Sequence, residues 1–307
     1  MKKIKTLLCG TNYGSVYLRY LAGLEEFSFN YILSRGSSRS LDISNRLSIK
    51  SYTNIENVEK DIELSVIAVD EINALTIAKT LINNGSSILI EHPVSHKGFL
   101  SLYRHAQEAN AILHINSHFR YTKAVSNFIS NIKNEKSTPV FVNASCSSRT
   151  LFSTIDILRS CFGKVNFEEV KIESDDKVTH AMLKFNNSNV IINFLHSELG
   201  DDNGQDVYIG HSINVHYEKS QSSLHDTWGC VVRSKTPKLN SLESLISIQD
   251  SAIDYNEILK SRDHAILKSL KNIYSSIIYK EDIKEQSFEH LHDTTKLYSI
   301  IRDKNAP

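Results

Sequence analysis

The chain has 307 residues, of which 40% are hydrophobic and 23% charged, and its 35 basic side chains are balanced by 35 acidic ones. Zero net charge counts against a nucleic-acid partner, since such domains usually carry a basic surplus. The composition is that of a folded protein, and no apolar stretch approaches the roughly 18 residues of a membrane span.

The first 118 residues alternate short strand-like runs with helical patterns. The strand-like runs are Lys5–Cys9, Phe29–Leu33, Lys50–Thr53, Leu64–Val69, Ile88–Ile90 and Ala111–Ile115. Helical patterns run to about Leu24 and over Arg39–Leu47, Ile72–Ile82 and Leu100–Asn110. Strands that alternate with helices of roughly 10–15 residues predict βαβ units and therefore a parallel sheet.

The pattern changes after about residue 119. Helices are predicted over Thr122–Ile132 and, near the C-terminus, Ala265–Tyr279. Strand-like runs lie at Val140–Ala144, Glu168–Ile172, His180–Phe185, Val190–Leu195 and Ile213–Tyr217, with turns at Asn186-Asn187 and Asp201–Gly204. These runs predict a mainly antiparallel open sheet in an α+β domain. We expect an α/β protein with domains of residues 1–118 and 119–307, the last helices packing back on the first domain.

A glycine-containing turn follows the first predicted strand directly. The segment Gly10-Thr11-Asn12-Tyr13-Gly14 stands between this strand and a helix, where a dinucleotide-binding fingerprint belongs. Glycine makes the tight turn, and the start of the helix offers N–H groups to a pyrophosphate. Asn12 and Ser15 replace the later glycines of GxGxxG; asparagine tolerates a positive φ and serine packs closely. The segment predicts a phosphate-binding loop, the alternative being an ordinary strand–turn–helix corner.

The end of the second predicted strand discriminates between the nicotinamide cofactors. NAD sites place an acidic residue there to bind the ribose 2′-hydroxyl. The segment Ser34-Arg35-Gly36-Ser37-Ser38-Arg39 contains no acid but two arginines and three hydroxyls. Guanidinium groups bind phosphate through charge-assisted hydrogen bonds. The segment therefore favours NADPH over NADH, unless it is only a solvated polar loop.

The strand Ile88–Ile90 continues into Glu91-His92-Pro93. Here the chain resembles the Gfo/Idh/MocA family of NAD(P)-dependent oxidoreductases, in which Glu-Lys-Pro follows this strand and the lysine serves acid–base catalysis beside the nicotinamide. The resemblance implies a Rossmann-type first domain, with Glu91 and Pro93 near the cofactor and His92 in the place of the lysine. Imidazole, with a pKa near 6.5, donates or accepts a proton more readily than an amine near 10.4. The alternative is a histidine that only caps the strand end.

One branch of this family, the thiazolinyl imine reductases of siderophore biosynthesis (yersiniabactin and pyochelin type), resembles the chain more closely. That branch shares Glu-His-Pro and a loop of the form Gly-x-x-[aromatic]-Gly. It also resembles the chain at Gly36–Ser40 and at Ser148–Asp156. The similarity covers residues ~4–160 and is thin beyond them.

The resemblance implies NADPH-dependent reduction of a thiazoline C=N bond to a thiazolidine, on an intermediate tethered to a carrier domain of a nonribosomal peptide synthetase. His92 is the first candidate for the proton donor, and no metal or covalent nucleophile is required. The branch carries Phe-Tyr-Pro after the sixth strand, and its tyrosine is a second candidate donor. This chain has Phe119 at that position. Either His92 acts alone, or His118 or Tyr121 supplies the group, or the substrate differs.

Asp156 belongs to a further candidate group, on a helix predicted to begin near Leu151. In the wider family an aspartate on the corresponding helix approaches the catalytic centre. The alternative is an acid of the first helical turn that interacts favourably with the helix dipole.

Two other functions remain open: a sugar or polyol dehydrogenase, which would prefer lysine at position 92, and a non-catalytic NADP-binding accessory protein. Four scattered cysteines without ligand spacing predict free thiols in a reducing cytoplasm. Thirteen histidines show no HExxH or comparable spacing, so we expect no metal. Homodimerisation is common in the family and is expected here, and membrane or nucleic-acid partners are not.

Overall fold

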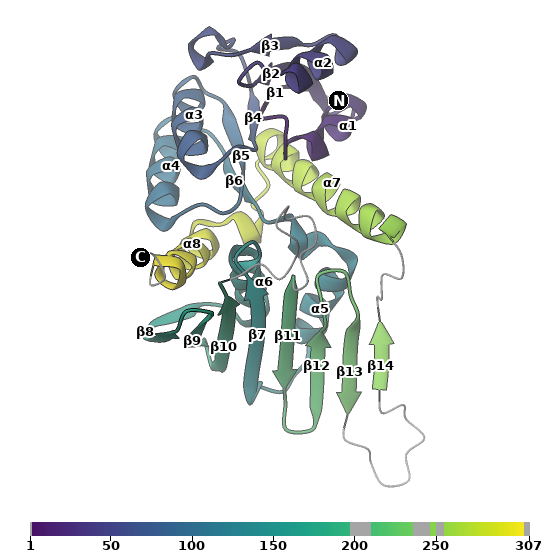
Figure 1. Cartoon of the computed structure of the whole chain (residues 1–307), viewed down its shortest axis with the longest axis vertical. Coiled ribbons are helices and arrows are strands. Elements are labelled where there is room, and N and C mark those ends of the chain that lie inside the picture. Colours follow the sequence, from purple (N-terminus) through teal and green to yellow (C-terminus); the bar gives the residue numbers. More distant parts are fainter. Residues whose placement is uncertain (1, 197–209, 236–245, 250–254, 304–307) are drawn as a thin grey trace. The chain divides into compact units, whose positions relative to one another are not determined.

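The structure is a computed structural model that describes residues 2–196, 210–235, 246–249 and 255–303. The chain divides into two compact units (Figure 1). The first consists of Met1–Asn116 and Ile266–His292, and the second of Ser117–Ala265 and Asp293–Pro307. The predicted turn at Asp201–Gly204 lies outside the described residues. No helix in the described ranges is both long and apolar enough to span a membrane.

The first unit is built on a six-stranded parallel sheet in the order β3-β2-β1-β4-β5-β6. Its strands are β1 (Ile4–Cys9), β2 (Phe27–Leu33), β3 (Lys50–Tyr52), β4 (Leu64–Ile67), β5 (Ser87–Glu91) and β6 (Leu113–Asn116). The strand order reverses between β1 and β4, which is the switch point where doubly wound sheets bind their ligands. The predicted Rossmann-type parallel sheet is confirmed.

Helices cover both faces of this sheet. They are α1 (Ser15–Gly23), α2 (Ser38–Leu47), α3 (Glu71–Asn83), α4 (His96–Glu108) and part of α7 (Tyr255–Tyr279), with the short η1 (Ile55–Asn57) and η3 (Lys284–Gln286). α3 and α4 lie on one face, and α1, α2 and α7 on the other (Figure 1). Tyr17 and Leu21 of α1 share a core with Leu270 and Ile273 of α7. Covering both faces buries the central strands β1 and β4 almost completely, which explains their continuous apolar runs.

The second unit contains an eight-stranded sheet in the order β14-β13-β12-β11-β7-β10-β9-β8. The strands are β7 (Phe141–Ser147), β8 (Val165–Ser174), β9 (Val178–Phe185), β10 (Ser188–Leu195), β11 (His211–His216), β12 (Ser220–Leu224), β13 (Val231–Lys235) and β14 (Ile246–Gln249). All neighbouring pairs are antiparallel except β7 with β10. This confirms the predicted mainly antiparallel sheet.

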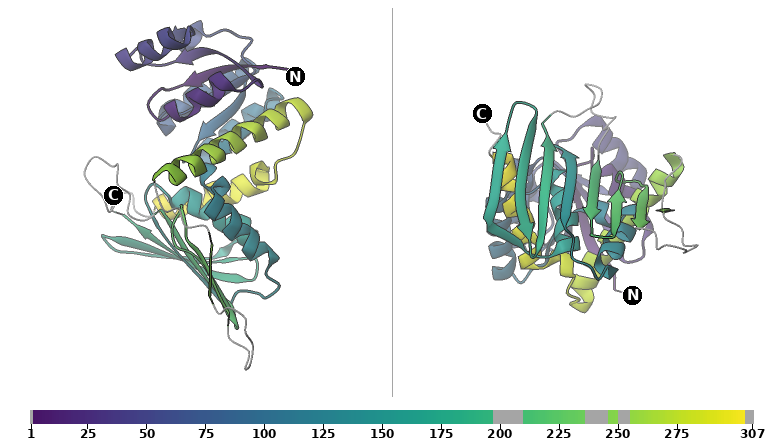
Figure 2. Two further views of the ribbon diagram at one scale, coloured as in Figure 1. Left: turned by 90° about the vertical axis from the view of Figure 1, so that its right-hand side faces the viewer. Right: turned by 90° about the horizontal axis from the view of Figure 1, so that it is seen from below.

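One face of the second sheet is covered by α5 (Lys123–Asn134) and α6 (Leu151–Phe162), while η2 (His118–Tyr121) precedes them in the chain (Figure 2). Burial therefore alternates along β9, β10 and β11. Strand β12, Ser-Gln-Ser-Ser-Leu, is mostly polar and was not predicted, because only one of its residues carries a large apolar side chain. Helix α7 starts at Tyr255, well before the predicted Ala265. The boundary between the two units falls within α7, at Ile266, and again within α8 (Phe288–Asp303), after His292.

Candidate functional site

The turn after β1 has the close packing that a phosphate-binding loop requires. Gly10 has a φ of 89°, and a Cβ there would come within 2.5 Å of the carbonyl oxygen of Ala68. A Cβ on Gly14 would come within 2.1 Å of the Gly10 carbonyl oxygen. Both positions therefore require glycine, and α1 begins at Ser15 directly behind them.

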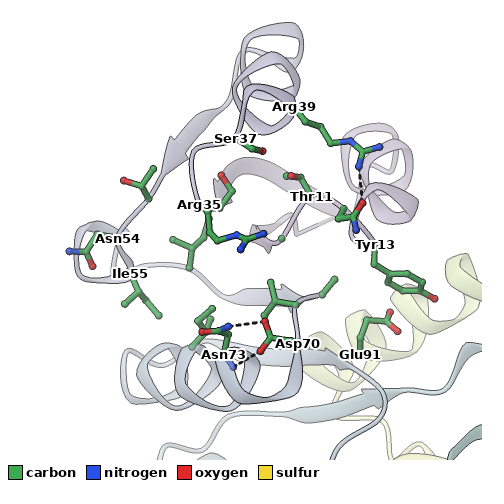
Figure 3. A pocket seen from close by; sticks show the side chains of 18 of the residues that line it. Thr11, Tyr13, Arg35, Ser37, Arg39, Asn54, Ile55, Asp70, Asn73 and Glu91 are labelled. Carbon is green, nitrogen blue, oxygen red and sulfur yellow. Dashed lines mark hydrogen bonds between the residues drawn. The ribbon is translucent and has the colours of Figure 1, made fainter. Parts of the chain in front are cut away.

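Asn12 contributes to the loop through its side chain rather than through an unusual backbone conformation. It does not adopt a positive φ; in this loop Gly10 alone does. The Asn12 side chain instead accepts a hydrogen bond from Arg39 Nη1 over 2.8 Å (Figure 3). The tolerance of asparagine for a positive φ is therefore not used here, and the Asn12 side-chain amide pairs with Arg39 of α2.

A cavity of about 990 Å³ opens at the carboxyl ends of the parallel strands (Figure 3). The predicted residues that line it are Gly10, Thr11, Asn12, Tyr13, Ser34, Arg35, Ser37, Arg39, Glu91 and His92. Gly14 and Pro93 do not line it. Four further polar residues, Thr53, Asn54, Asp70 and Asn73, contribute to the wall. A volume of this size is at the upper end of ordinary ligand sites.

The cationic part of the wall comes from the segment between β2 and α2. Arg35 extends into the cavity (Figure 3) and forms no hydrogen bond or ion pair within the described ranges. Ser37 caps α2, its hydroxyl accepting from the backbone N–H of Ser40. The amino end of α2 adds a positive partial charge, and its first turn contains no acidic residue. The wall thus offers an anion two guanidinium groups and a helix terminus.

Asp70 is the acidic residue of the wall that the sequence did not identify. It caps α3, accepting from the backbone N–H and the side-chain amide of Asn73 over 3.2 and 2.7 Å. These hydrogen bonds lower the pKa of Asp70, and the positive charge of Arg35 contributes. Asp70 follows β4, so the rule that ligands bind at carboxyl ends of parallel strands could have located it.

Glu91 and His92 follow one another at the end of β5, with side chains only 8% and 6% exposed. His92 Nδ1 donates to the main-chain carbonyl of Asn116 over 2.6 Å, because a carbonyl oxygen can only accept. Burial lowers the pKa of His92, and burial raises that of Glu91 to about 8. At neutral pH the imidazole is therefore mostly neutral and the Glu91 carboxyl mostly protonated.

The remaining candidates, His118, Tyr121 and Asp156, belong to the second unit. His118 is buried in η2, and the centroid of its ring lies 4.3 Å from that of the Phe119 ring. The guanidinium of Arg120 lies 6.0 Å from the ring centroid of Tyr121.

Asp156 is buried on α6 and forms an ion pair with the buried Arg120. The predicted start of this helix at Leu151 is confirmed, but its first turn contains no acid. The alternative interpretation of Asp156 as a first-turn acid is therefore wrong. Its carboxylate instead lies against Arg120, a residue that no sequence pattern marked.

A doubly wound sheet with a glycine turn at its switch point defines a dinucleotide-binding domain. Residues 4–117 match the model of the Gfo/Idh/MocA family, described as an oxidoreductase family with an NAD-binding Rossmann fold. The matched residues are those that form the parallel sheet of the first unit and most of the helices that cover it. Among curated proteins, none matches the chain in sequence.

Solved structures share the fold over nearly the whole chain. A dehydrogenase (MviM) from Clostridium difficile has a TM-score of 0.75 at 14% identity, with 99% of this chain and 100% of that one covered. Biliverdin reductase from Synechocystis, in complex with biliverdin and NADP+, has a TM-score of 0.74 at 11% identity, with 98% of both chains covered.

An oxidoreductase from Agrobacterium radiobacter, in complex with NAD+, L-tartaric acid and magnesium, has a TM-score of 0.73 at 12% identity, with 97% of this chain and 96% of that one covered. At such identities the likeness concerns the fold alone. One of these structures contains NAD+ and another NADP+.

Proposed function

We propose that the protein is an NADPH-dependent reductase that converts the C=N bond of a carrier-bound thiazoline into a thiazolidine. The observation that carries the proposal is the cavity, which joins a tightly packed phosphate loop, a cationic wall and the Glu91-His92 pair. The substrate class rests on the sequence motifs shared with the thiazolinyl imine reductases.

The residues of the cavity fit NADPH. Any side chain at Gly10 would meet the backbone of Ala68, so the close approach of the loop is built into the sequence. Arg35, which forms no hydrogen bond or ion pair with a described acid, and Arg39 suit a 2′-phosphate through charge-assisted hydrogen bonds. Asp70 does not stand in the place of the missing acid, since it follows β4 rather than β2 and caps α3.

When bound, NADPH supplies the hydride for the carbon of the C=N bond. His92 supplies the proton for the nitrogen. Because Nδ1 donates to Asn116, proton transfer takes place at Nε2, and the imidazolium becomes a neutral imidazole as the amine forms. The neighbouring Glu91 carboxyl lies 3.8 Å from Nδ1 and adds negative charge only when it ionises.

The proposal includes a carrier domain of a nonribosomal peptide synthetase as partner, a homodimer, and a cytoplasmic location. The free state of all four cysteines supports the last of these.

The direct test is NADPH oxidation with a thiazoline thioester mimic, beside NADP+ reduction with a panel of polyols and sugars. We expect turnover with the thiazoline alone. Turnover with a polyol alone would refute the proposed substrate. Binding of NADPH without turnover on any compound would favour an accessory protein instead.

A second candidate function, an NADP-dependent sugar or polyol dehydrogenase, is favoured by one observation. Burial lowers the pKa of His92, so the imidazole is ready at neutral pH to accept a proton from an alcohol. In this direction His92 performs the task of the family's lysine as a general base.

The pH dependence of the rate separates the two directions. Reduction needs the protonated imidazole, so its rate should fall about tenfold per pH unit above the pKa of His92, which lies below 6.5. Oxidation needs the neutral imidazole and should rise through the same pKa to a plateau. Both profiles are measured as kcat/KM between pH 5 and 8. A reduction rate that does not change with pH over this interval would exclude His92 as the acid.

A further inference from the structure

Four buried side chains of the first unit form one hydrogen-bonded network behind His92. They are Tyr17 of α1, Glu91 of β5, Asn116 of β6 and Ser269 of α7, and each comes from a different element. Neither Tyr17, Asn116 nor Ser269 lines the cavity, so the network reaches the site only through Glu91 and His92.

Asn116 stands at the centre of the network, and every polar atom of its side chain is engaged. Its Nδ2 donates to the Tyr17 hydroxyl and, over 2.7 Å, to Glu91 Oε1. Its Oδ1 accepts from the Ser269 hydroxyl over 2.7 Å. Tyr17 donates in turn to the same Glu91 oxygen. Since donors and acceptors alternate around the set, only one orientation of the amide satisfies all of them.

The main chain of Asn116 connects this network to His92. Asn116 is the last residue of β6 and is paired in register with Glu91 of β5, the residue that precedes His92. The main-chain carbonyl of Asn116 accepts from His92 Nδ1 over 2.6 Å. The side-chain hydrogen bonds of Asn116 therefore hold the peptide group that determines which imidazole nitrogen carries the hydrogen.

We propose that Tyr17 and Ser269 are positioning residues, which act through Glu91 and Asn116 to keep His92 in its Nδ1–H tautomer with Nε2 as the nitrogen that exchanges the proton. This inference rests on the proposed role of His92 and adds two residues that neither touch the cofactor cavity nor belong to a sequence motif. It also connects the helix of the phosphate loop, through Tyr17, to the proton-transferring group.

The chain offers a matched control for each positioning residue. Ser276, also buried on α7, donates to the Glu281 carbonyl over 2.8 Å and lies outside the network. Tyr274, buried in the same core, donates to the Lys2 carbonyl over 2.9 Å. Replacing Ser276 by alanine or Tyr274 by phenylalanine removes a comparable buried hydrogen bond without affecting Asn116.

The first measurement needs no activity. Imidazole ¹⁵N shifts of His92 in the cofactor-free protein, assigned with the His92→Ala variant, report the tautomer directly. We expect Nδ1–H in the parent protein and in Ser276→Ala and Tyr274→Phe, and a mixture of tautomers in Ser269→Ala and Tyr17→Phe. An unchanged tautomer in both network variants would overturn the inference.

Turnover is the second measurement. Ser269→Ala and Tyr17→Phe should lower kcat roughly 3- to 10-fold, the effect of one hydrogen bond, and leave the NADPH Kd unchanged. Ser269→Thr, which keeps the hydroxyl, should restore kcat. Equal losses in the control variants would mean a merely structural role. If the tautomer shifts as expected but His92→Ala retains full activity, the positioning inference stands and the proposed role of His92 is refuted.

Discussion

Replacement of His92 by alanine should lower kcat by about 10²- to 10⁴-fold, the range in which general acid–base catalysis contributes. His92 is the titratable side chain that both lines the cavity and has a nitrogen fixed by a main-chain hydrogen bond. Removing the imidazole leaves the phosphate loop and both arginines intact. The Kd of NADPH, measured by fluorescence titration, should therefore change by less than about twofold.

The informative control is His92→Asn. An asparagine amide at this position can still donate to the Asn116 carbonyl but cannot transfer a proton, so its kcat should be as low as that of the alanine variant. Recovery of activity in His92→Asn would show that the histidine only holds the strand end. Full activity in both variants would move the proton donor elsewhere, with Tyr121 and His118 the next to test.

Replacement of Arg35 by alanine should raise the Kd of NADPH roughly 10- to 100-fold and leave that of NADH within twofold. A hydrogen bond to a charged group contributes about 1.5–3 kcal/mol. The Arg35 guanidinium forms no hydrogen bond or ion pair with a described residue, so it can form such a bond to the 2′-phosphate. Affinities of both nucleotides are measured by titration on the same preparation. Equal affinity of the parent protein for NADH and NADPH would contradict the assignment of a 2′-phosphate site.

Arg39→Ala is expected to be less selective, because it also removes the hydrogen bond to Asn12 in the phosphate loop. Arg39→Ala should therefore weaken the binding of both nucleotides, and that of NADPH more than that of NADH. Arg46→Ala is the matched control on the same helix: its side chain is 69% exposed, pairs with Asp42, and does not line the cavity. It should bind both nucleotides like the parent protein.

The fold was predictable because burial on both faces of a parallel sheet gives continuous apolar strands such as β1 and β4. Glycine at positions 10 and 14, the arginines after β2 and the histidine after β5 were predictable for a related reason. They follow strands directly, and parallel strands bring their carboxyl ends to one edge.

What the sequence did not reveal depends on contacts between distant segments. The hydrogen bond from Arg39 to Asn12 and the contact of Ser269 with Asn116 join residues that no local pattern connects. Serine-rich β12 has little apolar periodicity, so the sequence did not mark it as a strand. It is recognised as one only through its pairing with β11 and β13. The buried pair of Arg120 and Asp156 is likewise visible only once η2 and α6 are placed together.

Helix α7 has a consequence for how segments of this fold can be exchanged between related chains. The first unit is discontinuous in the sequence, because it consists of residues 266–292 as well as the first 116. A fragment that ends near residue 118 would lack Leu270, Ile273 and Ser269, and so would expose part of its core and lose one arm of the network around Asn116. A single crossover after β6 between two relatives would therefore separate His92 and Asn116 from Ser269, the residue that we propose as one of their positioning residues. Two crossovers, the second within α7, keep the first unit whole but also exchange residues 293–307 of the second unit, so an exchange of the first unit alone needs a third crossover near residue 292.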